Sequence, residues 1–366
     1  MASRTKAVDA PPIPTLQVEQ ARTRPRNRAA TFRSFVVTFF AVVVLAAFLS
    51  PMLRVVTTAL KSTEQITEAN APLWPADPGT FEWEGEEYDV YQVAIDGAIR
   101  DLALVNKGRQ ESEFIDPANP GDGLTTWTGS WRALERSWEL APQWSNFGDV
   151  WDIIDFPRLL FNTVALAVIG TLGTLFSCVL VAYGFARFRF PGRNFLFLIV
   201  LSTIFLPAAV TLIPTYTIYV KLGWVGTWLP LLVPAFFANA YDVFLLRQYF
   251  LTLPRELDDA AKIDGAGPFK VLTAIIIPQS WAVIVAVAVF HLVYTWNLYF
   301  EPLLYLSSKP ELQPIATGLA AFNSIYSSSP ELIQAATLMT IVIPMAIFFV
   351  AQRAFMRGIV ITGVEK

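Results

Sequence analysis

The sequence predicts an all-α polytopic membrane protein with six transmembrane helices and a small external α+β insertion between the first two. Of its 366 residues, 54% are hydrophobic and 16% are charged, whereas soluble domains carry about 25% charged residues. Several apolar runs reach the length of about 20 residues that a spanning helix needs. One long acidic stretch, residues 74–151, interrupts this pattern and predicts the insertion.

The six predicted spans are apolar runs in chain order. They are Phe35–Val56, Phe161–Phe185, Phe195–Val220, Thr227–Leu246, Trp281–Phe300 and Leu332–Ala351. Runs this long and continuous disfavour a membrane β-barrel, the other structure that satisfies backbone groups in lipid. The first run follows several arginines and exceeds the roughly 7–15 apolar residues of a signal peptide, so we interpret it as an uncleaved span.

The distribution of Lys and Arg predicts the orientation of the chain in a plasma or inner membrane. Short cytoplasmic loops carry an excess of these residues. They gather in the second loop, the fourth loop and the C-terminal tail: Arg187, Arg189, Arg193, Arg247, Arg255, Lys262, Lys270, Arg353, Arg357 and Lys366. The third and fifth loops hold only Lys221 and Lys309. Both termini and the even-numbered loops are therefore expected in the cytoplasm, and the net charge of −3 argues against nucleic-acid binding.

These predictions divide the chain into four parts. They are a disordered basic cytoplasmic tail (1–30), the first helix with its external start (31–73), the external insertion (74–151) and the core of helices 2–6 (152–366), which holds a cytoplasmic loop at 247–279.

Few polar residues lie inside the predicted spans. Intramembrane polar groups face the bundle interior or a water path by default. Tyr294 and Asn297 are candidates for a transport pathway, although Asn297 also fits an interfacial Trp-Asn pair. The lone His291 is expected to be packed and hydrogen-bonded, and Cys178 to be a small packing residue. The prolines of the third, fourth and sixth spans fit either hinges or ordinary kinks.

The fourth loop contains the most regular polar segment, ELDDAAKIDGAGPFKVLTAIIIP, at Glu256–Pro278. Pro254 is expected in the first turn of a helix that begins with acids, which suit its positive end. Leu257, Ala260, Ala261 and Asp264 share one mostly small face, and Gly265 suits a left-handed helix end. A second helix is expected to open at Pro268 and stop at Pro278. This helix–Gly–helix elbow suits a groove on a partner better than a solvated linker.

The elbow resembles the EAA loop of the membrane (permease) subunits of binding-protein-dependent ABC importers, in the carbohydrate-uptake, maltose-type branch. The family pattern is E-A-A, three residues, G, nine residues, I, one residue and L-P. This chain has Asp259-Ala260-Ala261, then Gly265, Ile275 and Ile277-Pro278, with Asp259 in place of Glu and Ile277 in place of Leu. The segments ALKSTEQI, AYGFARFRFPGR, FLLRQYF, YTWNLYFEPL and QRAFMRG also resemble the family.

The resemblance implies a six-helix importer permease without catalytic or metal-binding residues. It assigns contact with a cytoplasmic ATPase to the residues Glu256, Asp259, Ala260, Ala261, Asp264, Gly265, Ile275, Ile277 and Pro278. The implied partners are a cytoplasmic ABC ATPase dimer, a second permease subunit, with a heterodimer favoured, and an external sugar-binding protein. ATP-Mg is expected in the ATPase, because this chain lacks the G-x-x-x-x-G-K-[ST] phosphate loop. The branch suggests an oligosaccharide or α-glucoside, which no residue proves.

The insertion does not match the usual short loop of this family. Between Phe81 and Leu140 the chain carries 13 acidic and 5 basic residues, and seven of its 11 tryptophans lie between Trp74 and Trp151. The segment FEWEGEEYDVYQVAIDG predicts short strands and WRALERSWEL a short helix. We expect an external cap that contacts the binding protein or the sister subunit. An inert insertion that packs its own aromatic residues is the alternative.

Two other functions fit the sequence less well than an importer subunit does. A transporter driven by an ion gradient often shows inverted repeats, and no convincing repeat is present. Such a transporter would also carry more ionisable residues inside its membrane spans than this chain does. A membrane-anchored scaffold for the external cap would not need a capped cytoplasmic elbow.

Overall fold

The computed structural model describes residues 28–95, 97–322 and 329–360, in two compact units that meet at Met52 and Leu53. Helix α1 (Arg28–Ala59) forms the described part of the first unit and the start of the second. Its side chains from Phe32 to Leu53 are exposed, as suits a helix whose partner is lipid. Residues 28–30 are helical, whereas the sequence predicted disorder; the rest of that predicted tail lies outside the described residues.

The described helices agree with the predicted spans in number, and several are broken. Four segments are long and apolar enough to cross a membrane: Phe32–Ala59 of α1, Phe156–Arg187 (α4), Leu229–Thr252, and Pro330–Gln352 of α15 (Pro330–Val360). The third of these segments consists of α7 (Leu229–Leu232), η4 (Val233–Phe237) and α8 (Ala240–Thr252). Two bent pairs bring the number to six: α5 (Arg193–Ser202) with η3 (Thr203–Phe205) and α6 (Ala208–Lys221), and Pro268–Gln279 with α12 (Trp281–Trp296).

The breaks correct three predicted spans. The third is interrupted before α6, where Pro207 is the residue preceding the helix. The fourth is interrupted at Ala238, which has a left-handed φ of 65°, and Asn239, whose side chain caps α8. The fifth ends at Trp296, before the short helix α13 (Phe300–Tyr305). Proline cannot donate a backbone hydrogen bond, and a cap residue is not helical, so an apolar run does not guarantee a continuous helix.

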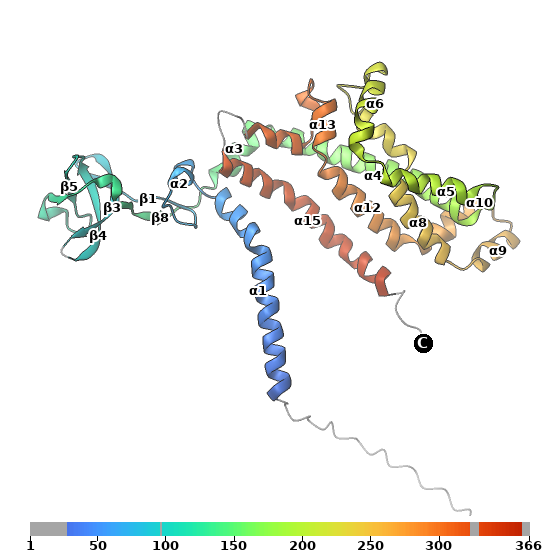
Figure 1. The fold of residues 1–366 in the computed structure, drawn as a ribbon, viewed down its shortest axis with the longest axis horizontal. Coiled ribbons are helices and arrows are strands. Elements are labelled where there is room, and N and C mark those ends of the chain that lie inside the picture. Colours follow the sequence, from blue (N-terminus) through green and yellow to red (C-terminus); the bar gives the residue numbers. More distant parts are fainter. Residues whose placement is uncertain (1–27, 96, 323–328, 361–366) are drawn as a thin grey trace, which may run out of the picture. The chain divides into compact units, whose positions relative to one another are not determined.

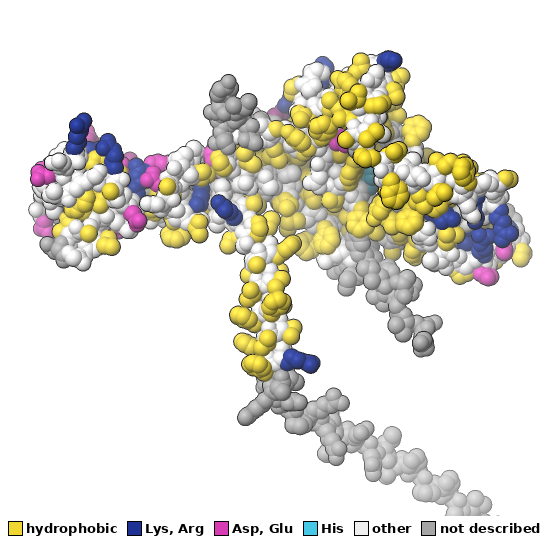
Figure 2. All heavy atoms as spheres, viewed as in Figure 1, with side chains coloured by type: hydrophobic (Ala, Val, Ile, Leu, Met, Phe, Trp, Pro, Cys, Tyr) yellow, Lys and Arg dark blue, Asp and Glu magenta, His cyan; other side chains and the backbone are white. Residues whose placement is uncertain are grey.

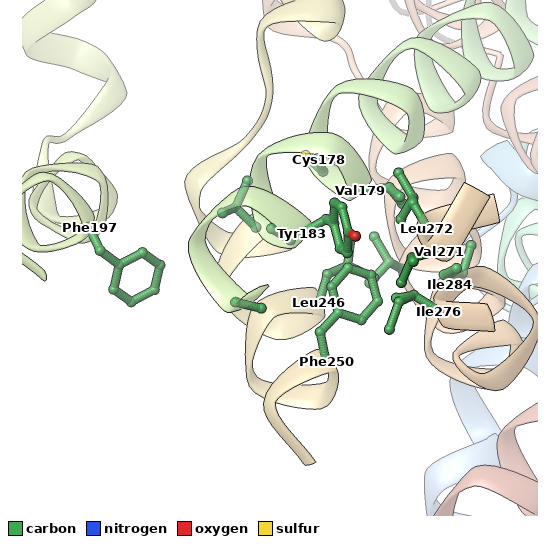
Figure 3. Close-up of a cluster of buried hydrophobic side chains, with 14 of the residues drawn as sticks. Cys178, Val179, Tyr183, Phe197, Leu246, Phe250, Val271, Leu272, Ile276 and Ile284 are labelled. Carbon is green, nitrogen blue, oxygen red and sulfur yellow. The ribbon is translucent and has the colours of Figure 1, made fainter. Parts of the chain in front are cut away.

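Helix α4 is the central element of the second unit, and it packs against α8, α12 and η4 (Figure 1). Its largest buried cluster joins Tyr183 to Leu246 and Phe250 of α8 and to residues that follow α10 (Figure 3). Cys178 belongs to this cluster and is fully buried, which confirms its predicted packing role. A second cluster joins α4 to α3 (Ser145–Ile153), α14 (Ile315–Gly318) and α15.

Polar side chains also hold α4 to a segment far away in the sequence. Asn162 Nδ2 donates to the carbonyl oxygens of Glu311 and Gln313, each at 2.9 Å. Thr163 Oγ1 accepts from the backbone N–H of Ile315 at 2.8 Å. Non-helical backbone within a membrane bundle needs such protein partners, because lipid supplies none.

The insertion is an antiparallel β structure between α2 (Thr63–Thr67) and α3. Its strands are β1 (Ala76–Pro78), β2 (Thr80–Trp83), β3 (Glu86–Ile95), β4 (Ala98–Asn106), β5 (Glu111–Ile115), β6 (Thr125–Thr128), β7 (Glu135–Arg136) and β8 (Trp138–Leu140). The main sheet has the order β2-β3-β4-β5-β6, with β7 paired to β3, whereas β1 pairs with β8. The predicted strands are thus present.

The aromatic residues of the insertion mostly pack against one another. Tyr91 and Phe114 form one cluster with Trp127 and Trp131, and Trp83 stacks at a tilt against Tyr88 in another cluster. The short helix predicted at 131–140 is wrong, since this segment forms a 3₁₀ turn, β7 and β8. This segment pairs with β3, and the ring of Trp131 meets that of Tyr91 edge to face with centroids 6.1 Å apart. These contacts outweigh the local helix preference of the segment.

The double hydrogen bond of Asn162 is expected to matter for stability. Asn162→Ala removes two part-buried hydrogen bonds, each worth about 0.5–1.5 kcal/mol, and should cost about 1–3 kcal/mol of unfolding free energy. Thermal unfolding of the purified protein in detergent should show the loss. Asn297→Ala is the matched control, because Asn297 is exposed and bonds only within its own helix. An equal melting temperature for the two variants would contradict the role of Asn162.

Candidate functional site

The elbow predicted from the sequence is present. Its first arm is α9 (Glu256–Ile263), and its second arm is continuous from α10 (Pro268–Val271) through a π-helical segment, η5 (Leu272–Ile276), to α11 (Ile277–Gln279). The backbone oxygen of Arg255 accepts from the N–H groups of Asp258 and Asp259 and so begins α9. Pro254 therefore precedes the helix, which corrects its expected place in the first turn.

A Schellman motif separates the two arms. The N–H of Ala266 donates to the oxygen of Ala261 at 2.8 Å, and that of Gly265 donates to the oxygen of Lys262 at 3.0 Å. Gly265 has a φ of 77°, the left-handed conformation that this motif requires. Gly267 and Pro268 then start α10 in the predicted place.

The second arm does not stop at Pro278. The helix passes through this proline to Gln279 and turns by 80° at the buried Ser280 into α12. The π-helical segment lies directly upstream, and proline occupies the second position of α11. Because the hydrogen-bond pattern has already shifted there, the missing N–H of Pro278 is accommodated without ending the helix.

Two polar contacts attach the elbow to the end of α4. Arg187 Nη1 lies 3.4 Å from Asp258 Oδ2, and the two side chains are only 5% and 12% exposed. Tyr183 Oη donates to the backbone oxygen of Pro268 at 3.0 Å. The first contact holds α9 and the second holds α10, so one membrane helix is connected to both arms.

Apolar packing supports the same attachment. Ala261, Val271, Leu272 and Ile276 belong to the cluster around Tyr183, and Figure 3 shows the last three close to that ring. Sequence reasoning missed Asp258 and Arg187. The available signal was position, since Asp258 lies three residues before Ala261 on the inward side of α9.

The residues predicted to contact a partner divide between the surface and the interior. Those exposed are Glu256, Asp259, Ala260, Asp264, Gly265 and Pro278, whereas Ile275 and Ile277 are half-buried and Ala261 is buried. The predicted small face is therefore split, because Ala261 packs inward. Asp259 forms an exposed ion pair with Lys262 of its own helix at 3.0 Å.

The outer surface of the elbow carries apolar side chains among charged ones. Leu257, Ile263 and Phe269 are 37%, 87% and 73% exposed. Lys and Arg side chains gather at this end of the second unit, around α9 and α10 (Figure 2). Exposed apolar groups with a polar rim are typical of a protein interaction site.

A cavity of about 350 Å³ lies between helices of the second unit, lined by residues of α4, α6, α7, η4, α12 and α13. The ring of His291 lies on its wall, with Nε2 3.1 Å from Thr174 Oγ1 and Nδ1 3.7 Å from Asp242 Oδ2. His291 is thus packed and hydrogen-bonded, as predicted. Asp242 was missed, although it follows the cap residue Asn239, whose Oδ1 accepts from the N–H of Asp242 at 3.3 Å.

The two pathway candidates lie in different places. Tyr294 lines the cavity. Asn297 is not among the lining residues, and its Nδ2 donates to the oxygen of Val293 in the preceding turn at 2.7 Å. Within residues 28–95, 97–322 and 329–360, no group of three or more His, Cys, Asp and Glu side chains is arranged to hold a metal ion.

Comparisons with known proteins agree with this geometry. Residues 175–360 match the family model described as "Binding-protein-dependent transport system inner membrane component". The "Osmoprotective compounds uptake permease protein GgtD" of Synechocystis sp. is 32% identical, over 69% of this chain and 85% of the relative. The "sn-glycerol-3-phosphate transport system permease protein UgpE" of Rhizobium meliloti is 35% identical, over 57% of this chain and 74% of the relative.

The fold has a similar solved structure. It is a chain of a bacterial ABC transporter involved in the import of the acidic polysaccharide alginate, with a TM-score of 0.62 and 19% identity. The similarity covers 91% of this chain and 100% of the other. At this identity it supports the fold alone.

The conformation of Gly265 leads to a test with a matched control. An added Cβ meets no atom within 4 Å at either Gly265 or Gly267, but only Gly265 has a positive φ. Gly265→Ala should therefore destabilise the elbow by about 1–2 kcal/mol. The amide of Ala266 should then exchange with deuterium about tenfold faster, while Gly267→Ala leaves its rate unchanged. Equal exchange in both variants would contradict the Schellman assignment.

Proposed function

Because the chain belongs to the family of binding-protein-dependent transport system inner membrane components, we propose that it forms half of the translocation pathway of an ATP-driven sugar importer. Its elbow is the site that couples this pathway to a cytoplasmic ATPase. The subunit is not an enzyme, since permease subunits of this family are non-catalytic. ATP-Mg binds to the ATPase partner and not to this chain.

The attachment of the elbow carries the coupling proposal. Its outer side presents Leu257, Ile263 and Phe269 to solvent, while its inner side binds α4 through Arg187 and Tyr183. The second arm also continues directly into α12. A partner that displaces the elbow therefore displaces two membrane helices. Such an element passes movement inward more directly than a solvated linker does.

The mechanism is a shift between two states. ATP brings the ATPase subunits together, the elbows follow, and the membrane helices open the pathway outward; hydrolysis reverses the change. A ligand biases such an equilibrium by its different affinity for the two states. A sugar-loaded external binding protein that prefers the outward state adds a second, linked bias.

The charge distribution supports an orientation in the inner membrane. The elbow and the end of α4 carry the Lys and Arg residues of the second and fourth loops (Figure 2), so this end lies in the cytoplasm. Both termini then lie on the same side, and the β insertion lies outside. The importer contains a second, different permease subunit, an ATPase dimer and an external sugar-binding protein.

The substrate is an oligosaccharide or an α-glucoside. The relatives named above are a permease for osmoprotective compounds and a permease for sn-glycerol 3-phosphate, and both names denote small polar solutes. The family assignment argues against the alternative of an ion-gradient-driven transporter.

The insertion is an external contact site for the binding protein or the sister subunit. The packing of Trp83, Trp127 and Trp131 within it supports a stable small fold. Trp74, Trp144 and Trp151, which flank the strands, remain 56%, 68% and 48% exposed. Exposed tryptophans of this kind are enriched in the cores of interfaces.

The coupling proposal is tested by purifying the tagged chain from crosslinked membranes and identifying co-purified proteins by mass spectrometry. An ATPase should accompany the native chain and fall by at least about tenfold with Gly265→Arg or Phe269→Asp, because a charged group on the elbow disrupts a packed interface. Leu124→Asp, an exposed position in the insertion, should retain it. Full recovery with both elbow variants would refute the coupling site.

The role of the insertion is tested by removing residues 80–136 and joining the ends with a short Gly-Ser linker. This deletion keeps the hydrogen bond partners Gly79 and Ser137, whose N···O distance is 2.8 Å. The binding protein should then stimulate ATP hydrolysis by the assembled transporter several-fold less, whereas unstimulated hydrolysis persists. Unchanged stimulation would favour an inert insertion.

A further inference from the structure

We propose that the membrane cavity of this subunit is a binding site for uncharged, polyhydroxylated cargo and that its acidic wall rejects anions such as sugar phosphates and uronates. This inference rests on the proposed function and restricts its substrates to uncharged compounds. It depends on three properties of the cavity: its size, its unused hydroxyl groups and its charge.

The cavity has the size of a small-molecule site. Its volume of about 350 Å³ lies within the range of about 300–1,000 Å³ that ligand pockets occupy. Its wall combines apolar residues such as Leu166 and Pro234 with a small number of polar groups. Broken helices contribute several of these residues, as is typical of membrane sites that hold polar solutes.

Three tyrosines give the cavity the chemistry of a sugar site. Tyr219 and Tyr305 meet edge to face with ring centroids 5.4 Å apart, and Tyr294 lies near His291 at 6.1 Å. In the described part of the chain, none of the three hydroxyl groups forms a hydrogen bond, although Tyr305 is only 5% exposed. Hydroxyl groups on a cavity wall that have no protein partner are available to a ligand that supplies one. Flat rings and free hydroxyls together suit the C–H faces and O–H groups of a sugar.

The charge of the wall is acidic. Glu301 lines the cavity, and Asp242 lies directly behind His291. Among the described residues that line it there is no Lys or Arg, and Lys309, which is not a lining residue, pairs with Glu311 at 3.5 Å. The wall therefore carries the Glu301 carboxylate and no fixed positive charge, with a second carboxylate behind it. In a site of low dielectric constant this field repels anions strongly, whereas neutral cargo is unaffected.

The electrostatic part is tested without knowing the cargo. In membranes that hold the complete transporter, a cysteine is introduced as Thr295→Cys, at a lining position with no assigned binding role, and reacted with aminoethyl (cationic) and sulfonatoethyl (anionic) methanethiosulfonates. The unmodified chain gives the background, because its single cysteine, Cys178, is fully buried. After normalisation to a free thiol, the cationic reagent should react at least about tenfold faster, which is a difference of about 1.4 kcal/mol between the two reagents, or about 0.7 kcal/mol per unit charge.

Two further substitutions identify the source of this preference. Glu301→Gln should reduce the rate ratio at least about threefold, since it removes a charge from the wall. Glu311→Gln, outside the cavity, is the matched control and should leave the ratio unchanged. A ratio of one, a faster anionic reagent or an equal effect of both substitutions would overturn the acidic-wall assignment.

The binding part is tested by protection of the same cysteine from an uncharged maleimide. Matched pairs of cargo are used: trehalose with trehalose 6-phosphate, glycerol with glycerol 3-phosphate, and glucose with glucuronate as the uronate. A neutral compound at millimolar concentration should slow labelling several-fold, and no anion should do so. Equal protection by an anion, or none by any neutral compound, would overturn the proposal.

The test of the cavity site and the test of the coupling role can fail independently. A complex that still recovers its ATPase but shows no protection loses the cavity site and keeps the coupling role. A chain that recovers no ATPase but is protected by a neutral sugar keeps the site and loses the coupling role.

Discussion

The buried ion pair between Arg187 and Asp258 is the contact on which the working parts of this subunit depend. It joins the end of the central helix α4 to the first arm of the elbow, at a position with little access to water. Arg187 Nε and Nη2 and Asp258 Oδ1 have no hydrogen bond partner within the described residues. Removing one member of such a pair leaves an uncompensated buried charge, which typically costs 3–5 kcal/mol. The elbow is therefore fixed to α4 by an interaction that tolerates little change.

A second constraint acts where α8 begins beside α4. Lipid offers no hydrogen bonds, so every break in a membrane helix must be covered by protein or by a polar cavity. The break before α8 is covered in this way, because Asn239 caps the helix and Ser177 Oγ accepts from the N–H of Ala238 at 3.0 Å. The same break places Asp242 beside His291, which lines the cavity. The polar character of the cavity thus follows from how the chain ends one helix and begins another.

The insertion obeys different rules from the rest of the chain. Its sheet has small apolar clusters of its own, and the pairing of β1 with β8 brings its two ends together. The fully buried Gln65 of α2 reinforces this base, since its Nε2 donates to the oxygens of Pro72 and Trp74 and its Oε1 accepts from the N–H of Ala76. Ends that meet in this way allow a domain to be accommodated between two membrane helices without disturbing either helix.

The sequence by itself determined the apolar spans, the left-handed turn at Gly265, the start of α10 at Pro268 and the strands of the insertion. These features depend on local composition and on backbone conformations that one or two residues impose. Only the tertiary structure decided that Asp258 and not Asp259 faces Arg187, that Ala261 packs inward, and that Tyr294 rather than Asn297 lines the cavity. It also converted the expected helix at 131–140 into strands and carried the second arm through Pro278. Each of these outcomes depends on partners that are distant in the sequence, because burial and strand pairing are properties of the whole fold and not of a local segment.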